Sequence, residues 1–431
     1  MDNVEFHIPN NEREYLRELA KKQAEYASLD IMAQRKKMWY GLNNGCMGAR
    51  PPFIVEAGLP AGFDRDFMPK GILQCTTEAG RTLEEQLLRN IRNHELINDD
   101  KVVPDTFTIN WFLDIDEFGV KIEQEMIKDS QGVETGYRFL HPIKNLKEDF
   151  YLLRPAVCKV DKERTMAWKA FLQDLLGDIL KVDIQVGLAS FRTTQLTRRA
   201  NEIMGLEALF LAMCESPDEV HRLMAYLRDN ALRILRWFES NGILQLNNGN
   251  QISFGSSFNF TTRLPAPDYK KDDVVRLCDI WGASNSQETV SISPEMYHEF
   301  CFPYYRDVCE PMGLLYYGCC EPAHPVWDDI RQLPHLKKVS ISPWCDQKFM
   351  GEALQGTDIV FSRKPDPKYL GIEVKLDEEA WADHIRETLD ATRGVHVEFI
   401  IRDVYTVHGN LDKPRRAVEI ARREIDDHFK P

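Results

Sequence analysis

The sequence predicts an α/β protein built on a parallel sheet. From about residue 165 onward, segments with helical apolar spacing alternate with short apolar segments typical of buried strands. Several predicted strands end in small or polar residues, as expected where the carboxyl edge of a sheet carries a functional site. The chain contains neither a glycine-rich dinucleotide fingerprint nor a phosphate loop. This pattern alone leaves open whether the sheet closes into a barrel or stays open and doubly wound.

Residues 1–160 differ from this pattern, and we expect them to form an N-terminal extension that packs on the main unit at 161–431. Apolar positions at helical spacing within a charged segment predict a helix over 11–40. The remaining elements expected here are a strand at 53–56, a helix at 83–96, a half-buried strand at 106–113, and an irregular, partly β insertion at 114–160.

The second part of the chain carries clear helix-start signals. Pro217 precedes a long predicted helix at 218–241, and Ser293 with Pro294 marks the start of another at 294–309. Further helices are expected at 168–180, 205–214, 325–333, 377–392 and 414–429. Strands are expected at 182–186, 242–246, 314–318, 336–341, 358–362 and 395–403.

Composition excludes several classes of function. The net charge of -14 disfavours binding to a nucleic-acid backbone, and the chain has no apolar run long enough to span a membrane. The 10 cysteines form no compact disulfide framework, and the first residues do not resemble a signal peptide. We therefore expect a cytoplasmic protein whose cysteines are mostly small buried side chains.

The clearest chemical pattern follows the predicted strand at 314–318. In Leu314-Leu-Tyr-Tyr-Gly-Cys-Cys-Glu-Pro-Ala-His324, two thiols, a carboxylate and an imidazole follow the strand within six residues. These are zinc-type ligands held at a rigid strand end. We expect at least one of Cys319, Cys320 and Glu321 to bind metal. The alternative is that the cysteines are buried bystanders and that His324 belongs to the start of a helix.

A second polar group ends the predicted strand at 395–403. Val395, Val397, Phe399 and Ile401 alternate with polar residues, and Asp403 lies at the carboxyl tip of the strand. A barrel places functional groups at that position. Asp403 is therefore expected to ligate a metal or act as a base, or alternatively to pair with its neighbour Arg402 or cap a turn.

Weaker candidates follow other predicted strands. Asn247 and Asn248 have side-chain amides suited to a polar substrate group, although ordinary turn chemistry is the slightly favoured explanation. Gln287 precedes the helix at 294–309, and Asp346 follows the strand at 336–341. Tyr317 lies near a strand end and is expected to line a substrate pocket, with packing in the core as its alternative role.

These residues bear a resemblance to a known family. Ser291-Ile-Ser-Pro-Glu-Met-Tyr-His-Glu-Phe300, a Pro-Tyr-Tyr helix and then Gly318-Cys-Cys-Glu321 resemble the uroporphyrinogen-decarboxylase superfamily. Gly205-Leu-Glu207 and Ser216-Pro-Asp218 resemble the same family, so that the likeness covers roughly residues 165–431. The resemblance implies a (β/α)₈ TIM barrel with its site at the carboxyl ends of the strands.

The decarboxylase branch of this family binds its tetrapyrrole substrate through an N-terminal motif with two arginines. The stretch Arg50-Pro-Pro-Phe-Ile-Val-Glu-Ala-Gly-Leu-Pro60 resembles that motif, but Val55 or Glu56 and Leu59 stand where the arginines are expected. A carboxylate at this position would repel a carboxylate-rich substrate. This departure argues against the decarboxylase branch.

The other branch transfers methyl groups to or from corrinoid proteins and uses zinc bound by a His-x-Cys pair and a later cysteine. Tyr317 matches the histidine, Cys319 matches the first cysteine, and Asp403 falls near the later one. The resemblance implies zinc held by Cys319, Cys320, Glu321 and Asp403, with Glu321 and Asp403 also catalytic. It further implies a separate corrinoid protein as partner and a homodimer. Carboxylate ligands favour an oxygen leaving group, such as that of a methyl ether.

Two other functions stay open from the sequence. A metal-free decarboxylase or lyase of the same fold predicts a basic cleft and no metal. A non-catalytic binding barrel predicts neither a metal nor a deep polar pocket. Fold alone does not separate these classes, because function depends on the site.

Overall fold

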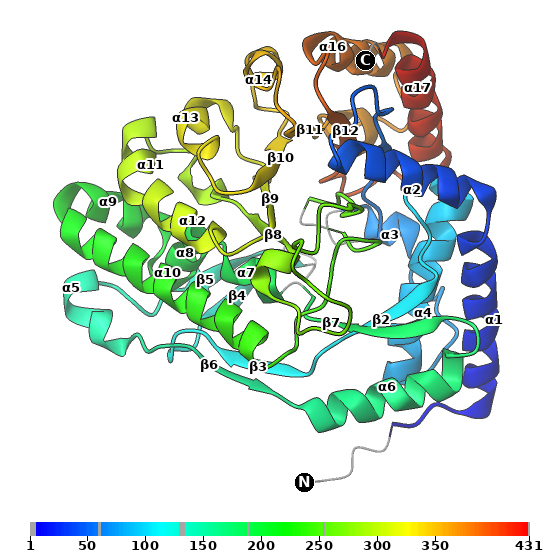
Figure 1. Ribbon diagram of the computed structural model, residues 1–431, viewed down its shortest axis with the longest axis horizontal. Coiled ribbons are helices and arrows are strands. Elements are labelled where there is room, and N and C mark those ends of the chain that lie inside the picture. The colour runs from blue at the N-terminus through cyan, green and yellow to red at the C-terminus, as the bar shows by residue number, and fades with distance from the viewer. Residues whose placement is uncertain (1–5, 59–61, 129–133, 188, 253–254, 430–431) are drawn as a thin grey trace.

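The computed structural model describes residues 6–58, 62–128, 134–187, 189–252 and 255–429. Its main sheet has six parallel strands flanked by helices (Figure 1). In sheet order the strands are β1 (Phe53–Val55), β12 (Val397–Ile401), β11 (Val360–Arg363), β10 (Leu336–Ile341), β9 (Leu314–Tyr317) and β8 (Trp281–Ser284). The predicted α/β class with a parallel sheet is confirmed.

The strands of this sheet are buried because both of their faces are covered. All five residues of β12 are buried, and the register pairs Phe53 with Phe399 and Val55 with Ile401. Phe399 packs in the core between the sheet and its outer helices, whereas Ile400 packs in a second core on the opposite face. Near-continuous apolar strands of this kind are typical of parallel sheets.

Helices follow the strands of the main sheet and cover its outer face (Figure 1). They are α11 (Pro294–Phe300), α12 (Phe302–Cys309), α13 (Trp327–Ile330), α14 (Gln347–Ala353), α15 (Lys368–Gly371), α16 (Glu378–Ala391) and α17 (Asp412–His428). The Ser293 hydroxyl accepts from the Met296 amide, which confirms the predicted cap. The single helix expected at 294–309 is instead two helices, because the chain bends at Cys301. Within the described residues, no helix is both long and apolar enough to cross a membrane.

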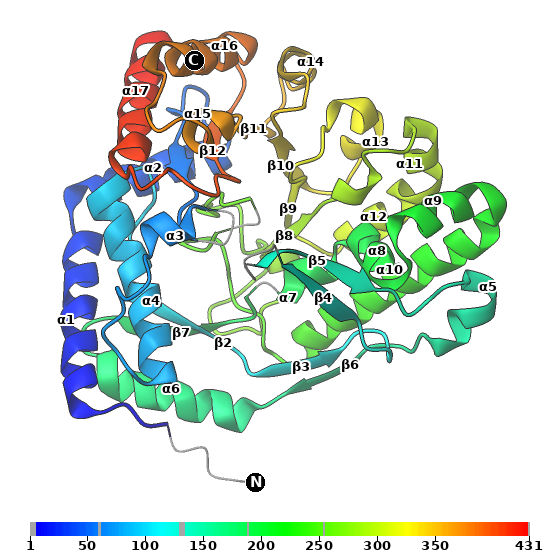
Figure 2. The same ribbon diagram turned by 180° about the vertical axis from the view of Figure 1, so that it is seen from behind.

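A separate parallel pair lies across from the main sheet. The strands β2 (Thr106–Asn110) and β7 (Lys181–Gln185) pair in register and pack their apolar face against α1 (Asn10–Ala27), α4 (Glu78–Arg92) and α6 (Lys162–Leu176). Figure 2 shows the main sheet and this pair on opposite sides of a common centre. Among the described residues, no backbone ladder joins the two sheets. The expected barrel is therefore observed only as two parallel sheets around one centre.

Between the two sheets, side-chain hydrogen bonds connect residues 245–247 to Val186, after β7, and to Trp281 in β8. Residues 242–246 were expected to form a strand, and this prediction is wrong, because the structure assigns no strand to these described residues. The Asn247 side-chain amide instead donates to the Trp281 backbone carbonyl at 3.0 Å. Its oxygen accepts from the Trp281 backbone N–H at 2.8 Å. The Gln245 side chain accepts from the Val186 amide at 3.1 Å. A carboxamide bonds a strand edge as a peptide group does.

The first 160 residues contribute a strand to the main sheet, because β1 lies between 53 and 55 and pairs with β12. The helix expected over 11–40 is two helices, α1 and α2 (Asp30–Asn43), separated at Ser28. The Ser28 hydroxyl donates to the Glu25 carbonyl at 2.7 Å and helps to end α1. The chain between 64 and 97 forms α3 (Asp64–Phe67), α4 and a π-helical turn at Asn93–Ile97.

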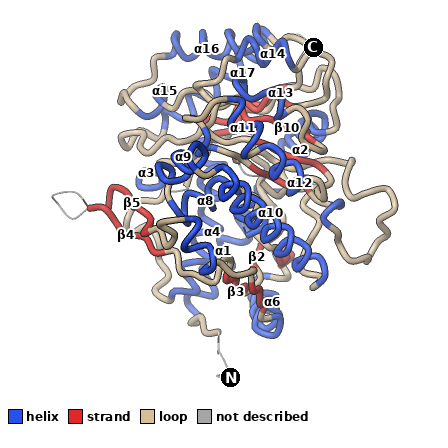
Figure 3. The backbone as a smooth tube through the Cα atoms, turned by 90° about the vertical axis from the view of Figure 1, so that its left-hand side faces the viewer, coloured by secondary structure: helices blue, strands red, loops and turns tan. Residues whose placement is uncertain are grey.

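An antiparallel insertion follows β2. The strand β3 (Leu113–Asp116) pairs with β6 (Val157–Val160), and β4 (Glu123–Lys128) pairs with β5 (Glu134–Leu140) in a hairpin. Figure 3 shows this hairpin projecting from the body of the molecule. The helices near it in the sequence are α5 (Leu146–Asp149), α7 (Ala189–Thr193), α8 (Leu196–Met204), α9 (Leu206–Glu215) and α10 (Pro217–Ser240).

Candidate functional site

Two strand ends bring the predicted thiols and carboxylate together. Cys319 and Cys320 follow β9, and Asp403 follows β12. The Cys319 and Cys320 sulfurs are 3.4 Å apart, and the Cys320 sulfur is also 3.4 Å from Oδ2 of Asp403. Residues 83 positions apart in the sequence are thus in contact. The sequence-based expectation that both strand ends contribute to one cluster agrees with this arrangement.

The backbone at both strand ends has an unusual conformation. Gly318 has φ +97°, and a Cβ there would lie 3.1 Å from the Ser340 Cβ. Glycine therefore allows the chain to turn directly after β9 and direct both thiols inward. Asp403 has φ +59°, a left-handed conformation that costs a non-glycine residue roughly 1 kcal/mol or more. Such strain is concentrated at functional sites in proteins.

Arg402 lies beside this cluster. Its Nε is 3.2 Å from Asp403 Oδ2 and 4.0 Å from Glu56 Oε2. Burial would lower the pKa of Arg402, but Glu56 and the neighbouring thiols and carboxylate outweigh burial and raise it. Glu56 is buried and accepts a hydrogen bond from Ser256. Of the positions that differ from the two-arginine motif, Glu56 thus lies at the cluster, whereas Leu59 lies outside the described residues.

The protonated form of Cys319 is favoured in this setting. Its hydrogen bond with Cys320 and its burial both raise the pKa of the thiol, and Arg402 opposes them. Cys319 is buried, Cys320 is half-buried, and the Asp403 side chain is 33% exposed. The cluster therefore has one thiol held inside the protein and a thiol and a carboxylate that face its opening.

Glu321 holds the backbone of the cluster in place. Its carboxylate accepts from the Ser286 amide at 3.0 Å and from the Cys319 amide at 2.9 Å. Burial raises its pKa, although these amide hydrogen bonds oppose the rise. Glu321 therefore links the ends of β8 and β9, and its two oxygens point to backbone amides rather than to the thiols.

The weaker candidates are not gathered at this cluster. The Tyr317 hydroxyl is fully buried and bonds to Ser286 and to Tyr297 at 2.6 and 2.7 Å, on the helix side of the sheet. Asn248 donates to the Leu264 carbonyl at 2.7 Å. The other candidates have different structural positions: Asn247 bonds Trp281, Gln287 is exposed in a 3-10 turn, Asp346 caps α14, and His324 accepts from the Asp346 amide.

Sequence reasoning missed a buried charge network on the inner face of the sheet. Lys338 in β10 and Glu398 in β12 form an ion pair of 3.1 Å, and both side chains are fully buried. Ser257 contacts both partners, at 2.5 Å from Lys338 Nζ and 2.8 Å from the Glu398 carboxylate. Ser362 donates to Glu398 at 2.5 Å and accepts from Lys364 Nζ at 2.6 Å. The available signals were the charged residues inside the two strands, Lys337 and Lys338 in β10 and Glu398 in β12.

This network contains more amines than carboxylates. Burial lowers the pKa of Lys338 and lowers that of Lys364 to about 7. Burial alone would raise the pKa of Glu398, but the two lysines and two serine hydroxyls together lower it. The pKa of Lys364 therefore lies near neutral pH, and the Cys319 thiol raises it while the Arg402 guanidinium lowers it.

We expect Lys364→Met to remove part of the pH dependence of stability. In the unfolded chain a lysine titrates near pH 10.4, whereas burial lowers the pKa of Lys364 to about 7 in the folded protein. Between these values the unfolded state binds more protons, so the free energy of unfolding rises with pH by up to about 1.4 kcal/mol per pH unit. Below about pH 7 both states are protonated, and the full cost of the buried ammonium is present.

Urea unfolding of wild type and Lys364→Met between pH 6 and 9 measures this difference. The exposed Lys348 provides the control as Lys348→Met, which should follow the wild-type curve. Identical pH profiles for wild type and Lys364→Met would show that the amine is not buried in its charged form at low pH.

The donor atoms of the cluster suit zinc by their chemistry. Two thiols and a carboxylate provide three protein ligands and leave a fourth position open, as in catalytic zinc sites. Within the described residues, however, no group of three His, Cys, Asp or Glu side chains is already arranged to hold a metal ion. Cys320 contacts both Cys319 and Asp403, and Arg402 contacts the Asp403 carboxylate. Binding would require the thiols to rotate and Asp403 to leave Arg402.

The chain is similar in fold to solved structures. A methyltransferase from Methanosarcina mazei superposes with a TM-score of 0.49 and 11% sequence identity, covering 92% of this chain and 99% of that chain. No protein-family model matches the sequence, and no curated protein sequence matches it. The residues of the site are therefore the basis on which a function is proposed below.

Proposed function

We propose that this protein is a zinc-assisted methyltransferase that moves a methyl group between a small methylated substrate and a corrinoid protein. The observation that carries the proposal is the continuous contact from Cys319 through Cys320 to Asp403 at two strand ends. The resemblance of 165–431 to the uroporphyrinogen-decarboxylase superfamily supports the same conclusion. The methyl donor that fits this site best is a methyl ether or a similar compound.

Cys319, Cys320 and Asp403 are the residues that would hold the metal. Zinc bound there acts as a Lewis acid on the heteroatom that leaves the methyl group. The mixed sulfur and oxygen donors make this site harder than one with thiolates alone, which suits an oxygen leaving group. Glu321 remains a positioning residue in this scheme, because it fixes the Cys319 backbone through an amide hydrogen bond.

Arg402 prepares the cluster for this role. Its positive charge favours the thiolate form of Cys319 against the effects of the Cys320 hydrogen bond and burial. In the structure, the Arg402 guanidinium forms an ion pair with the Asp403 carboxylate. If Asp403 were to hold the metal, Glu56, whose Oε2 lies 4.0 Å from Arg402 Nε, would be the carboxylate left to compensate the guanidinium.

The acidic surroundings make a porphyrinogen decarboxylase a poorer explanation. Glu56 projects at the end of β1, and Arg402 already faces Glu56 and Asp403. A substrate with several carboxylates would have to compete with Glu56 and Asp403 for the Arg402 guanidinium. We propose that the corrinoid is carried by a separate partner protein, that the chain forms a homodimer, and that it works in the cytoplasm, where its ten cysteines stay reduced.

The direct test is methyl transfer to free cob(I)alamin, followed by the absorbance of methylcobalamin. The zinc-loaded protein should transfer methyl groups from at least one member of a panel of methyl ethers, methylamines and methyl thioethers. Absence of methylcobalamin with the whole panel, from protein shown to contain zinc, would overturn the proposal.

Asp403→Asn is expected to reduce this activity by about 100-fold or more, because it removes an anionic ligand. Asparagine accepts the left-handed backbone at this position as readily as aspartate does. The melting temperature should therefore stay close to that of wild type while activity falls. Wild-type rates for Asp403→Asn would exclude this carboxylate from the reaction.

A further inference from the structure

A cavity separate from the thiol cluster lies between the β2–β7 pair and the segment at 244–252. It has a volume of about 710 Å³, and most of its lining comes from α4, β2, β7 and that segment. This volume is within the range of small-molecule sites. Cys319, Cys320 and Asp403 do not line it.

One wall of this cavity is the polar face of the β2–β7 pair. Phe107 and Val182 point away from the cavity, into the core formed with α1, α4 and α6. Because side chains alternate along a strand, the neighbouring residues point the other way and line the cavity: Thr106, Thr108, Lys181, Asp183 and Gln185. The inner face of a closed barrel is packed with branched apolar side chains. The inner face of this pair is polar instead, which suits contact with a polar molecule rather than a core.

Carboxamides are the commonest polar groups in the lining. They come from α4, from the end of β7 and from the segment at 245–251. A carboxamide has two N–H donors and an oxygen with two lone pairs. Asn247 uses one N–H and one lone pair on Trp281, so half of its capacity remains. Such a lining can donate to a hydroxyl group and accept from the same group.

One acceptor in this lining is buried without a partner. Among the described residues, no hydrogen bond reaches Oδ1 of Asn250. Buried polar atoms in folded proteins are nearly always hydrogen-bonded, because leaving such a bond unmade costs free energy. A hydroxyl group of a ligand in the cavity would supply the donor that this oxygen lacks.

Apolar side chains and few charges complete the lining. Trp111 donates its indole N–H to the Ile243 carbonyl at 2.9 Å, and its ring lines the cavity with leucine and isoleucine side chains. Lys181 pairs with Asp183 at 2.9 Å, which leaves Lys169 as the further charged residue of the lining. A single ammonium group donates to a hydroxyl as well as to an anion. The lining therefore combines hydrogen-bonding groups with apolar surface and carries little net charge.

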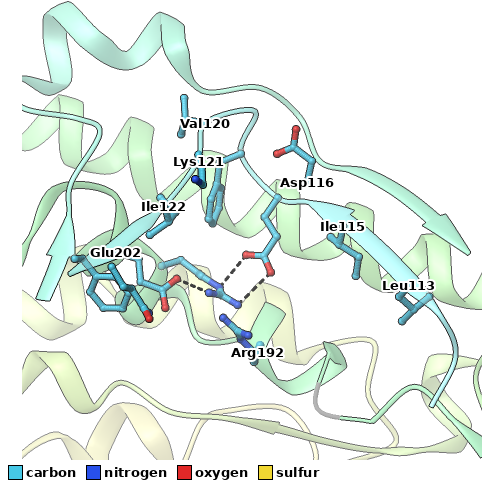
Figure 4. Close-up of a pocket in the computed structure, with 13 residues that line it drawn as sticks. Leu113, Ile115, Asp116, Val120, Lys121, Ile122, Arg192 and Glu202 are labelled. Carbon is cyan, nitrogen blue, oxygen red and sulfur yellow. Dashed lines mark hydrogen bonds and ion pairs between the residues drawn. The ribbon is translucent and has the colours of Figure 1, made fainter. Parts of the chain in front are cut away.

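The cavity beneath the β4–β5 hairpin has a different character (Figure 4). It has a volume of about 500 Å³, and its lining contains carboxylates and cations in equal number. Arg199 pairs there with Glu202 and, at 3.1 Å, with Glu117. Because these charged groups compensate one another, that cavity specifies no class of ligand.

We propose that the cavity between the β2–β7 pair and 244–252 binds a small neutral molecule rich in hydroxyl groups, such as a monosaccharide or a cyclic polyol. Its hydroxyl groups would exchange hydrogen bonds with the carboxamides, including those of Gln185 and Asn250. Its C–H groups would lie against Trp111 and the aliphatic side chains. Neither zinc nor the thiols take part, so this inference goes beyond the proposed methyl transfer and does not depend on it.

Isothermal titration calorimetry with a panel of neutral ligands tests the proposal. The panel is glucose, galactose, mannose, ribose and myo-inositol, and wild type should bind at least one member with a Kd below about 1 mM. Cyclohexanol has a six-membered ring but a single hydroxyl, and it should bind at least about tenfold more weakly than the best member. Glucuronate adds a negative charge to the same ring and should not bind more tightly than that member.

Two variants locate the binding in this cavity. Gln185→Met and Asn250→Leu each remove a carboxamide from the lining and should weaken binding of the best panel member by about tenfold or more. Asn250→Leu also removes a buried acceptor without a partner, so its melting temperature should not fall below that of wild type.

Two control variants should bind this ligand as wild type does. Gln332→Met removes an exposed carboxamide outside the cavity. Cys319→Ala/Cys320→Ala separates this inference from the fate of the methyltransferase proposal. The inference is overturned if wild type binds no panel member below about 1 mM, if glucuronate or cyclohexanol binds more tightly than the whole panel, or if Gln185→Met and Asn250→Leu bind as tightly as wild type.

Discussion

Replacing Cys319 and Cys320 with alanine should abolish zinc binding and, with it, methyl transfer. After reconstitution with zinc and removal of excess metal, the wild-type protein should hold roughly one zinc per chain, as a single three-ligand site does. The double variant loses two of the three proposed ligands, and one carboxylate does not retain zinc by itself. Elemental analysis of both proteins measures the difference directly.

The control for this experiment is Cys46→Ala/Cys214→Ala, which removes two exposed thiols elsewhere in the chain. It should bind as much zinc as wild type. If wild type and the Cys319→Ala/Cys320→Ala variant hold equal zinc, the metal lies at another site. If reconstituted wild type holds none, the methyltransferase proposal loses its main support, and a metal-free reaction has to be considered.

Glu398→Gln should give the largest loss of stability of any single change discussed here. It removes the carboxylate that compensates Lys338 and Lys364 inside the sheet, where all three side chains are buried. Removing one partner of a buried ion pair typically costs about 3–5 kcal/mol, because the remaining charge is left without a partner. Urea unfolding at pH 7 measures this loss as a fall in the midpoint.

A surface pair supplies the comparison. Glu378 pairs with Arg416 at 2.8 Å, but both side chains are exposed by more than two fifths. Glu378→Gln should therefore shift the urea midpoint far less than Glu398→Gln does, because solvent screens an exposed pair. The double variant Lys338→Met/Glu398→Gln should recover part of the stability lost in Glu398→Gln, because it removes both charges. A Glu398→Gln protein as stable as wild type would mean that the network is solvated or already neutral.

The strand ends could be predicted from the sequence because they obey local rules. Apolar segments bounded by glycine and charged residues located β9 and β12 to within a few residues, and the polar side chains after them therefore lay at one edge of the sheet. That placed Cys319, Cys320 and Asp403 together. The contact distances and the position of Arg402 between two carboxylates could not be derived, because they depend on side-chain packing.

The role of consecutive residues in a strand was harder to assign. Tyr316 and Tyr317 face opposite sides of β9, and the sequence does not state which side faces the centre. The structure places the Tyr316 hydroxyl 3.2 Å from Ser362 and the Tyr317 hydroxyl among the helices. The substrate role expected for Tyr317 thus depended on a choice between two faces that only tertiary structure makes.

The strand expected at 242–246 failed for a related reason. Its apolar residues suggest a strand, but a strand requires a neighbour at ladder distance. Asn247 and Gln245 satisfy the backbone groups of Trp281 and Val186 with their side chains instead. A sequence pattern shows that a segment is apolar. It does not show which groups will form hydrogen bonds with the backbone of the neighbouring segments.

The side-chain hydrogen bonds from Gln245 to Val186 and from Asn247 to Trp281 are expected to make this boundary open easily. The side-chain carboxamide of Asn247 makes two of the hydrogen bonds between this segment and β8, and the segment borders a cavity of about 710 Å³. A boundary held by few bonds next to open space opens at lower free energy than a continuous ladder. Backbone amides along 243–247 should therefore exchange with deuterium well before those of β9 to β12. In such an experiment the two sheets would behave as two cooperative units. These units would separate between residues 243–247 and β8 before either one unfolds.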